Sequence, residues 1–118
     1  MNGVLVIAHG SRAKETEVTN DAILKMVKAK LPGVVIESAF MEFSDQDIDK
    51  GLDALVARGV TDVKVVPYFL FAGNHIKRDI PEILAEQSAR LPQLKFTMGE
   101  TLGVDERLAD ILVERILD

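Results

Sequence analysis

The sequence contains no cysteine, and this absence excludes several kinds of site at once. Disulfide bonds, thiolate-bound metals and cysteine-ligated iron–sulfur clusters all need a thiol. Tryptophan is absent too, and aromatic residues make up only 5% of the chain, so a segment that gathers several of them is notable.

Long hydrophobic runs and a basic excess are also missing. A membrane-spanning helix needs about 20 consecutive apolar residues, and no segment approaches that length. The apolar run at the N-terminus is too short for a signal peptide and lacks a basic flank. The 14 basic and 19 acidic residues give a net charge of −5, whereas a nucleic-acid binder normally shows a basic excess. We therefore expect a soluble, cytoplasmic domain with no membrane and no nucleic-acid partner.

Apolar and amphipathic segments alternate along the chain. Its 118 residues, 47% of them hydrophobic, suit one domain with one core. Short apolar runs rich in β-branched residues predict strands at 3–8, 34–40, 62–70 and 94–99. Between and after them, apolar residues at helical spacing predict helices at 13–31, 44–59, 80–90 and 105–117.

Capping residues set the expected helix ends. Ser44 and Asp47 resemble a capping box for the second helix, and Gly59 supplies its C-terminal stop. Asp79 is the expected cap of the third helix, because Pro81 is well tolerated in a first turn. Three buried stripes are predicted: Val18, Ala22, Met26 and Ala29 in the first helix; Ile48, Leu52, Leu55 and Val56 in the second; Leu108, Ile111, Leu112 and Ile116 in the last.

Four strand–helix repeats with short loops predict a parallel sheet with right-handed crossovers. The expected fold class is α/β: a three-layer α/β/α sandwich with a four-stranded parallel sheet in the order 2-1-3-4, flavodoxin-like. A single domain would span residues 1–118.

The only two histidines fall beside the point where this strand order reverses. In open parallel sheets, ligands bind beyond the carboxyl ends of the strands at that point. His9 closes the first strand, and His75 is expected in the loop that follows the third. Glu42 follows the second strand and belongs to the same rim. Two imidazoles and a carboxylate suit a divalent transition metal.

Position alone does not separate a metal ligand from a histidine that merely ends a strand. The HGSR stretch also suggests a phosphate-binding turn, although the chain has neither GxxxxGK[ST] nor GxGxxG after its first strand. It lacks the GxSxG of a nucleophile elbow, and Ala8 stands where a histidine phosphatase would have arginine.

Cations and aromatics gather near both histidines. Arg12, Lys14, Lys77 and Arg78 flank the two histidine segments and would form a basic rim on an acidic protein, unless they are ordinary solvated side chains. Tyr68, Phe69 and Phe71 are half of the aromatic residues. They are expected mainly in the core, but they would also let a flat ligand stack.

Four segments together resemble the small, single-domain sirohydrochlorin chelatases, the short forms of the class II chelatases of cobalamin and sirohaem synthesis. The resemblance runs nearly end to end, and its PxFLxxGxHxxxDIP pattern is specific. The segments are AHGSR at 8–12, AFME at 39–42, PYFLFAGNHIKRDIP at 67–81 and LGVDERLADIL at 102–112.

The resemblance implies insertion of a divalent metal into sirohydrochlorin without ATP, by a homodimer with no permanently bound cofactor. It implies that His9 and His75 handle the metal and act catalytically, with Glu42 as the third participant. The expected substrate-binding residues are Ser11, Arg12, Phe69, Phe71, Gly73, Lys77 and Arg78. The cations among them would balance the negative charge of the macrocycle's many carboxylates. Ser11 with nearby backbone amides would bind one acetate or propionate arm.

Three functions therefore stay open. The first is a chelatase, with Co²⁺ the leading metal and Fe²⁺ or Ni²⁺ as alternatives, because imidazole binds all three. The second is a non-catalytic carrier of metal or tetrapyrrole. The third is a phosphate-ligand protein that uses the HGSR turn.

Overall fold

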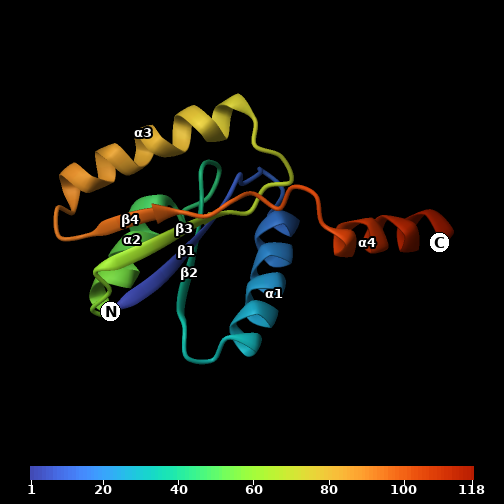
Figure 1. Ribbon diagram of the computed structural model, residues 1–118, viewed down its shortest axis with the longest axis horizontal. Helices are drawn as coiled ribbons and strands as arrows, with labels where there is room; N and C mark the ends of the chain where they lie inside the picture. Colours follow the sequence, from blue (N-terminus) through green and yellow to red (C-terminus); the bar gives the residue numbers. More distant parts are fainter.

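A four-stranded parallel sheet in the order β2-β1-β3-β4 organises the computed structural model (Figure 1). The structure describes the backbone of residues 1–118 and all side chains except those of Asn74 and His75. The predicted fold class and strand order are confirmed. The elements are β1 (Asn2–Ala8), α1 (Lys14–Lys30), β2 (Val35–Phe40), α2 (Ile48–Ala57), β3 (Asp62–Pro67), α3 (Asn74–Arg90), β4 (Lys95–Met98) and α4 (Glu106–Leu117).

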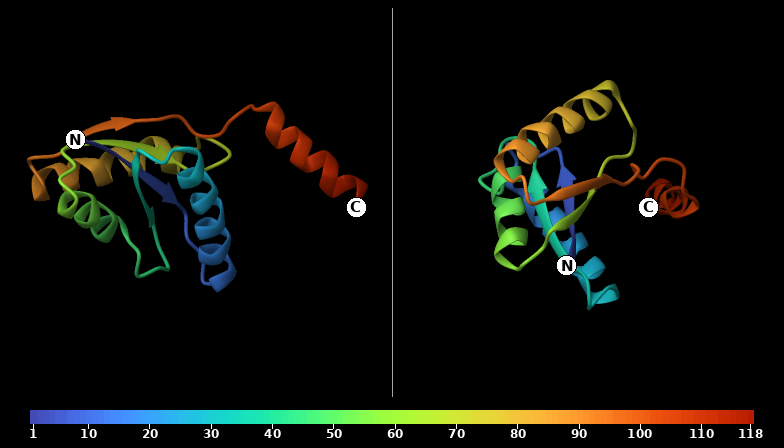
Figure 2. Two further views of the ribbon diagram at one scale, coloured as in Figure 1. Left: turned by 90° about the horizontal axis from the view of Figure 1, so that it is seen from below. Right: turned by 60° about the vertical axis from the view of Figure 1, so that its left-hand side comes forward.

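One face of the sheet carries the core. Leu5 and Ile7 of β1 pair with Val65 and Pro67 of β3, and all four side chains are fully or almost fully buried. Helices α2 and α3 cover this face, as Figure 2 shows, and place their own apolar side chains against it. Burying a side chain of this size contributes about 1.5–3 kcal/mol, so this layer dominates the stability of the fold. The helix residues in this core are Ile48, Leu52, Leu55, Ile80 and Leu84.

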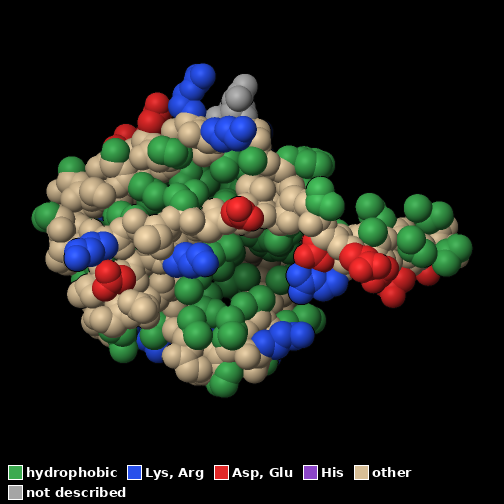
Figure 3. Space-filling model, in the orientation of Figure 1, with side chains coloured by type: hydrophobic (Ala, Val, Ile, Leu, Met, Phe, Trp, Pro, Cys, Tyr) green, Lys and Arg blue, Asp and Glu red, His purple; other side chains and the backbone are tan. Residues whose placement is uncertain are grey.

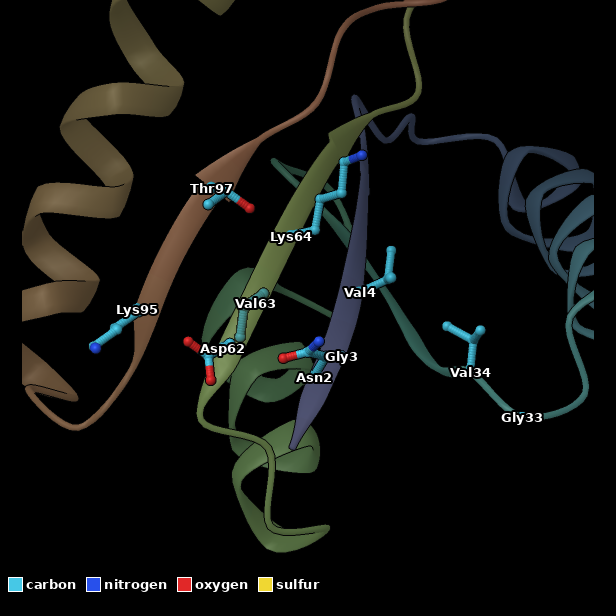
Figure 4. Close-up of a pocket in the computed structure, with 10 residues that line it drawn as sticks. All are labelled: Asn2, Gly3, Val4, Gly33, Val34, Asp62, Val63, Lys64, Lys95 and Thr97. Atoms are coloured by element: carbon cyan, nitrogen blue, oxygen red, sulfur yellow. The ribbon is translucent and has the colours of Figure 1, made fainter.

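The opposite face is covered only in part. Helix α1 lies over the β1–β2 side, while Val4 and Val6 of β1 stay half-buried and Lys64 of β3 is exposed. A cavity of about 490 Å³ opens on this face along β1, β3 and β4, with Lys64 and Thr97 in its lining (Figure 4). It lies at the amino half of the strands, away from His9. In Figure 3 the same face is hollowed and largely apolar.

Helix α4 does not pack inward. It projects from the body of the protein (Figures 1 and 2), and none of its residues is buried. The predicted buried stripe of Leu108, Ile111, Leu112 and Ile116 is therefore wrong for this chain: Leu112 is 63% and Ile116 79% exposed. The preceding loop is tied to the loop after β3, since Leu102 N–H donates to Phe69 O at 2.9 Å. Gly103 then takes a positive φ of 58° and turns the chain away from the sheet.

The start of α4 is set by a local ion pair. The Asp105 carboxylate accepts a hydrogen bond from the Arg107 backbone N–H at 2.9 Å and from the Arg107 guanidinium at 2.6 Å. These bonds lower the pKa of Asp105 to about 2. Asp105 therefore stays ionised and caps α4 at any pH well above that value.

Helix α3 begins earlier than predicted. Gly73 is its N-cap, so Asp79 does not cap it and Pro81 lies inside it. A proline within a helix removes one backbone hydrogen bond, here to the Lys77 carbonyl, and for that reason its usual place is the first turn. Because the prediction followed this preference, it placed the start of the helix too late. As a result, the backbone of His75 lies in the first turn of α3 and not in a loop.

Helix α2 is capped by a different residue than expected. The Asp47 carboxylate accepts from Lys50 N–H at 2.9 Å, so Asp47 is the N-cap and the predicted capping box at Ser44 is wrong. Ser44 instead accepts from Gln46 N–H and donates to the Glu17 carboxylate of α1. The predicted stop at Gly59 is consistent with its φ of +86°.

Helix α1 turns another side to the sheet than the sequence predicted. Asn20 and Leu24 are its buried residues, at 4% and 5% exposure. The observed buried residues and the predicted stripe both recur at helical spacing, so the sequence alone could not show which of them faces the sheet. The predicted stripe is exposed at all four positions, Val18, Ala22, Met26 and Ala29. No helix among the described residues is long and apolar enough to cross a membrane.

Candidate active site

His9 and Glu42 lie side by side where the strand order reverses. His9 follows β1 directly, and Glu42 follows β2, its neighbour in the sheet. The parallel ladder continues past the strand ends, because Met41 N–H donates to Ala8 O at 2.9 Å and Glu42 N–H to His9 O at 3.2 Å. These backbone bonds hold both residues at the carboxyl edge of the sheet.

Gly10 makes this close approach possible. Its φ is +88°, in the left-handed region that favours glycine. A Cβ atom at this position would lie 2.0 Å from the Glu42 carbonyl oxygen. Any other residue type would push the loop of His9 and the loop of Glu42 apart.

The His9 ring is supported on one side and open on the other. Its edge-to-face contact with Phe69 has a centroid distance of 4.9 Å and an interplanar angle of 86°. Phe69 is buried in the core, so it offers the imidazole a fixed wall. His9 Nδ1 lies 4.0 Å from Glu42 Oε1, too far for a hydrogen bond. Both side chains are more than half exposed and can reach a bound ligand.

This pair offers one imidazole and one carboxylate, groups that can bind a metal ion, but it does not form a closed site. Among the side chains that the structure describes, no group of three or more His, Asp or Glu residues is placed to hold a metal ion. The side chain of His75, the other predicted ligand, lies outside the described residues. An imidazole and a carboxylate that leave positions open on an ion suit a metal that must be released again.

The remaining predicted residues of the first loop lie close to His9 in the chain. Ser11 Oγ accepts a hydrogen bond from Ala13 N–H at 3.0 Å, and this bond shapes the loop before α1. Arg12 is exposed, and its Cζ lies 5.0 Å from the centroid of the Phe43 ring. Phe43, with a φ of 60°, belongs to the Glu42 loop, so this cation–π contact also joins the two loops.

The predicted aromatic residues divide into wall and rim. Phe69 is core, whereas Phe71 is 78% exposed. An open cavity of about 460 Å³ runs beside His9, lined by Tyr68, Phe69, Leu70, Phe71, Gly73 and Ile76. The loop after β3 thus presents an apolar surface next to the His9 imidazole, of the kind on which a flat ligand stacks.

The cations of the predicted basic rim lie on different elements. Lys77 and Arg78 are exposed on α3, and Lys77 lines a separate cavity beside Met98 and Leu102. Lys14 is exposed at the start of α1. Of the four cations, Arg12 is the one that a described contact ties to the loops of His9 and Glu42.

Asn20 also lies beside His9, although the sequence-based predictions did not include it. It lines a second cavity beside His9, of about 440 Å³, together with Gly10, Thr16, Phe40 and Tyr68. One signal could have found it: Asn20 is a polar residue four positions before the apolar Leu24, so both lie on the same side of the helix.

Comparison with known proteins identifies the family of this chain. Residues 3–118 match the family model described as CbiX. A sirohydrochlorin ferrochelatase from Priestia megaterium is 40% identical over 116 residues, which cover 98% of this chain and 44% of the relative. A sirohydrochlorin cobaltochelatase from Sulfurisphaera tokodaii is 36% identical over 116 residues, which cover 98% of this chain and 92% of the relative.

A solved structure agrees with the fold over almost the whole chain. The sirohydrochlorin chelatase SirB from Bacillus subtilis subspecies spizizenii, in complex with cobalt, matches with a TM-score of 0.90 and 33% identity. The match covers 99% of this chain and 50% of SirB. The chain therefore spans about half the length of SirB and of the ferrochelatase relative.

Proposed function

Because the chain belongs to the CbiX family, we propose that it inserts a divalent metal ion into sirohydrochlorin without ATP. The observation that carries this proposal is the pairing of His9 with Glu42 at the sheet edge, open to a ligand and beside an apolar rim. Co²⁺ is the leading metal, since the relative of similar length from S. tokodaii is named a cobaltochelatase. Fe²⁺ and Ni²⁺ are the alternatives, because imidazole binds each of these ions.

The proposed reaction needs three events that these residues can serve. The hydrated ion loses water, two pyrrole N–H groups lose their protons, and the macrocycle receives the ion from one face. The neutral imidazole of His9 takes the metal transiently or accepts a pyrrole proton, and the exposed Glu42 carboxylate passes that proton to water. His75, which the family resemblance pairs with His9, is the proposed second donor. The apolar surface of Tyr68 and Phe71 supports the flat ring.

A turnover assay tests this function. Sirohydrochlorin is mixed anaerobically with Co²⁺, Fe²⁺ or Ni²⁺, singly and in competition, without ATP, and metal insertion is followed in the visible absorption of the macrocycle. We expect the protein to accelerate insertion, most strongly with Co²⁺. Equilibrium dialysis with Co²⁺ alone is the control: a carrier binds the ion tightly and does not turn over. Rates equal to the protein-free reaction with all three metals would contradict a chelatase.

The proposed assembly is a homodimer, and α4 is its proposed contact. Apolar side chains cover one side of α4 and are exposed in the single chain, with Leu112 and Ile116 at 63% and 79% (Figure 3). Exposed apolar surface of this kind marks an interaction site in soluble proteins. A second copy is the proposed occupant, because two copies together reach the length of the longer relatives.

Replacing both Leu112 and Ile116 by glutamate should convert the dimer to a monomer. The two carboxylates would have to be buried unpaired in the interface, whereas in the single chain both positions are already in water. Light scattering after size-exclusion chromatography gives the mass, and circular dichroism should stay unchanged. Asp110→Lys, on the opposite side of α4, is the matched control and should remain a dimer. A wild-type protein that is monomeric at micromolar concentration would contradict this assembly.

A further inference from the structure

The side chain of Asn20 is buried beside His9 without a hydrogen-bond partner. It is 4% exposed, and within the part of the chain that the structure describes neither Oδ1 nor Nδ2 finds a donor or acceptor. Removing an amide from water without replacing its hydrogen bonds is unfavourable for folding. Leu24, one turn later, shows that an apolar side chain suits this side of α1. The packing of α1 therefore does not account for an asparagine here.

The surroundings of Asn20 indicate a place for a ligand. Asn20 forms part of the wall of the cavity of about 440 Å³ that also contains His9 and Gly10. This volume is within the range of small-molecule sites. A molecule bound in this cavity would therefore lie against both His9 and Asn20.

The chemistry of the lining favours a carboxylate. Thr16 lies four residues before Asn20 on α1 and Thr19 directly precedes it, and both threonines line the same cavity. Their hydroxyls and the Asn20 Nδ2–H are neutral donors, which a carboxylate accepts strongly. The Asn20 Oδ1 acceptor needs a donor of its own, which a water molecule that hydrates the same carboxylate would supply. Glu15 also lines the cavity, but it is exposed and its charge can stay in water.

We propose that Asn20 binds one carboxylate arm of the tetrapyrrole in the cavity beside His9. The inference rests on the proposed function for the identity of the ligand. It adds a residue that binds one side arm of the macrocycle beside His9, a role separate from the metal chemistry.

The test is Asn20→Leu, which keeps the size of the side chain and removes its polar atoms. We expect the dissociation constant of metal-free sirohydrochlorin, measured by absorption titration, to rise about tenfold, the effect of losing one hydrogen bond to a charged group. The KM for sirohydrochlorin should rise equally, with kcat for Co²⁺ insertion nearly unchanged. The melting temperature should stay the same or rise, because the variant no longer buries an unpartnered amide.

Gln87→Leu is the matched control. Gln87 is also buried, at 7% exposure, but it donates to Asp49 Oδ1 at 2.5 Å and accepts from Arg90 at 2.8 Å. Its replacement should lower the melting temperature and leave sirohydrochlorin binding unchanged. Asn20→Ala, which favours the helix, is the second variant should the leucine variant fail to fold.

The outcomes separate this inference from the proposed function. Unchanged binding in a folded Asn20→Leu or Asn20→Ala variant overturns the role of Asn20, even if the wild type is an active chelatase. Weaker binding in these variants supports the role of Asn20, even if the wild type inserts no metal. A wild type that does not bind sirohydrochlorin overturns both.

Discussion

Replacing His9 by alanine should lower the rate of metal insertion by about 10²–10⁴-fold, the usual contribution of a positioned proton-transfer group. The fold should survive, because the imidazole is 56% exposed and its main described contact is the edge of Phe69. Losing that contact costs about 0.5–1.5 kcal/mol of unfolding free energy. The measurement is kcat from the absorption of the macrocycle, with the melting temperature recorded for the same preparation.

Two further variants show whether the rate loss belongs to the chemistry of His9. Glu42→Gln keeps the size of the side chain and removes its charge, and should cost about tenfold in kcat, a partial loss of proton transfer. His75→Ala should match His9→Ala if the two histidines work as the pair that the family resemblance implies. Wild-type rates in the His9→Ala variant would show that the carboxyl edge of the sheet at His9 is not the active site.

Replacing Gly10 by alanine should both destabilise the protein and abolish most activity. The left-handed φ of +88° costs an L-residue about 1–2 kcal/mol. The new Cβ would also meet the Glu42 carbonyl at 2.0 Å, and relieving such an overlap costs about 1–3 kcal/mol more. The loops must separate, so Glu42 moves away from His9. Urea unfolding gives the free energy, and the turnover assay gives the activity.

Two other glycines serve as graded controls for this experiment. A Cβ at Gly33 meets nothing within 4 Å, so Gly33→Ala should be nearly neutral. Gly59 has a φ of +86° but open space around it, so Gly59→Ala should show the conformational cost alone. Gly10→Ala should exceed Gly59→Ala in lost stability, and only Gly10→Ala should reduce turnover. Equal effects in these two variants would mean that the contact between the His9 and Glu42 loops is unimportant.

The strands were predictable because their signal is local. GVLVIA and VVIESAF are short, rich in β-branched residues and followed by polar loops, and the structure has strands at both segments. The third strand was also predicted, although it ends at Pro67 and not at residue 70. Once the four strands are ordered, the placement of His9 and Glu42 at neighbouring strand ends follows from the sheet geometry alone.

Three of the errors concern helices whose placement is not decided locally. The buried side of α1 depends on how the helix lies on the sheet, and the sequence offers two lines of residues at the same period. The start of α3 required knowing that Pro81 would be accepted inside a helix. The exposure of α4 depends on the Gly103 turn and on backbone bonds to residues 69 and 70, which no periodicity reveals.

The sequence by itself determined the α/β class, the strand order and the positions of His9 and Glu42 on one edge, because alternating hydrophobic periods and parallel crossovers leave few other arrangements. Only the tertiary structure decided three things. It brought the Glu42 carbonyl so close to Gly10 that a side chain is excluded, it buried Asn20 beside His9 without a partner, and it left the apolar side of α4 uncovered. Each of these depends on distances between segments far apart in the chain, which composition and spacing do not encode.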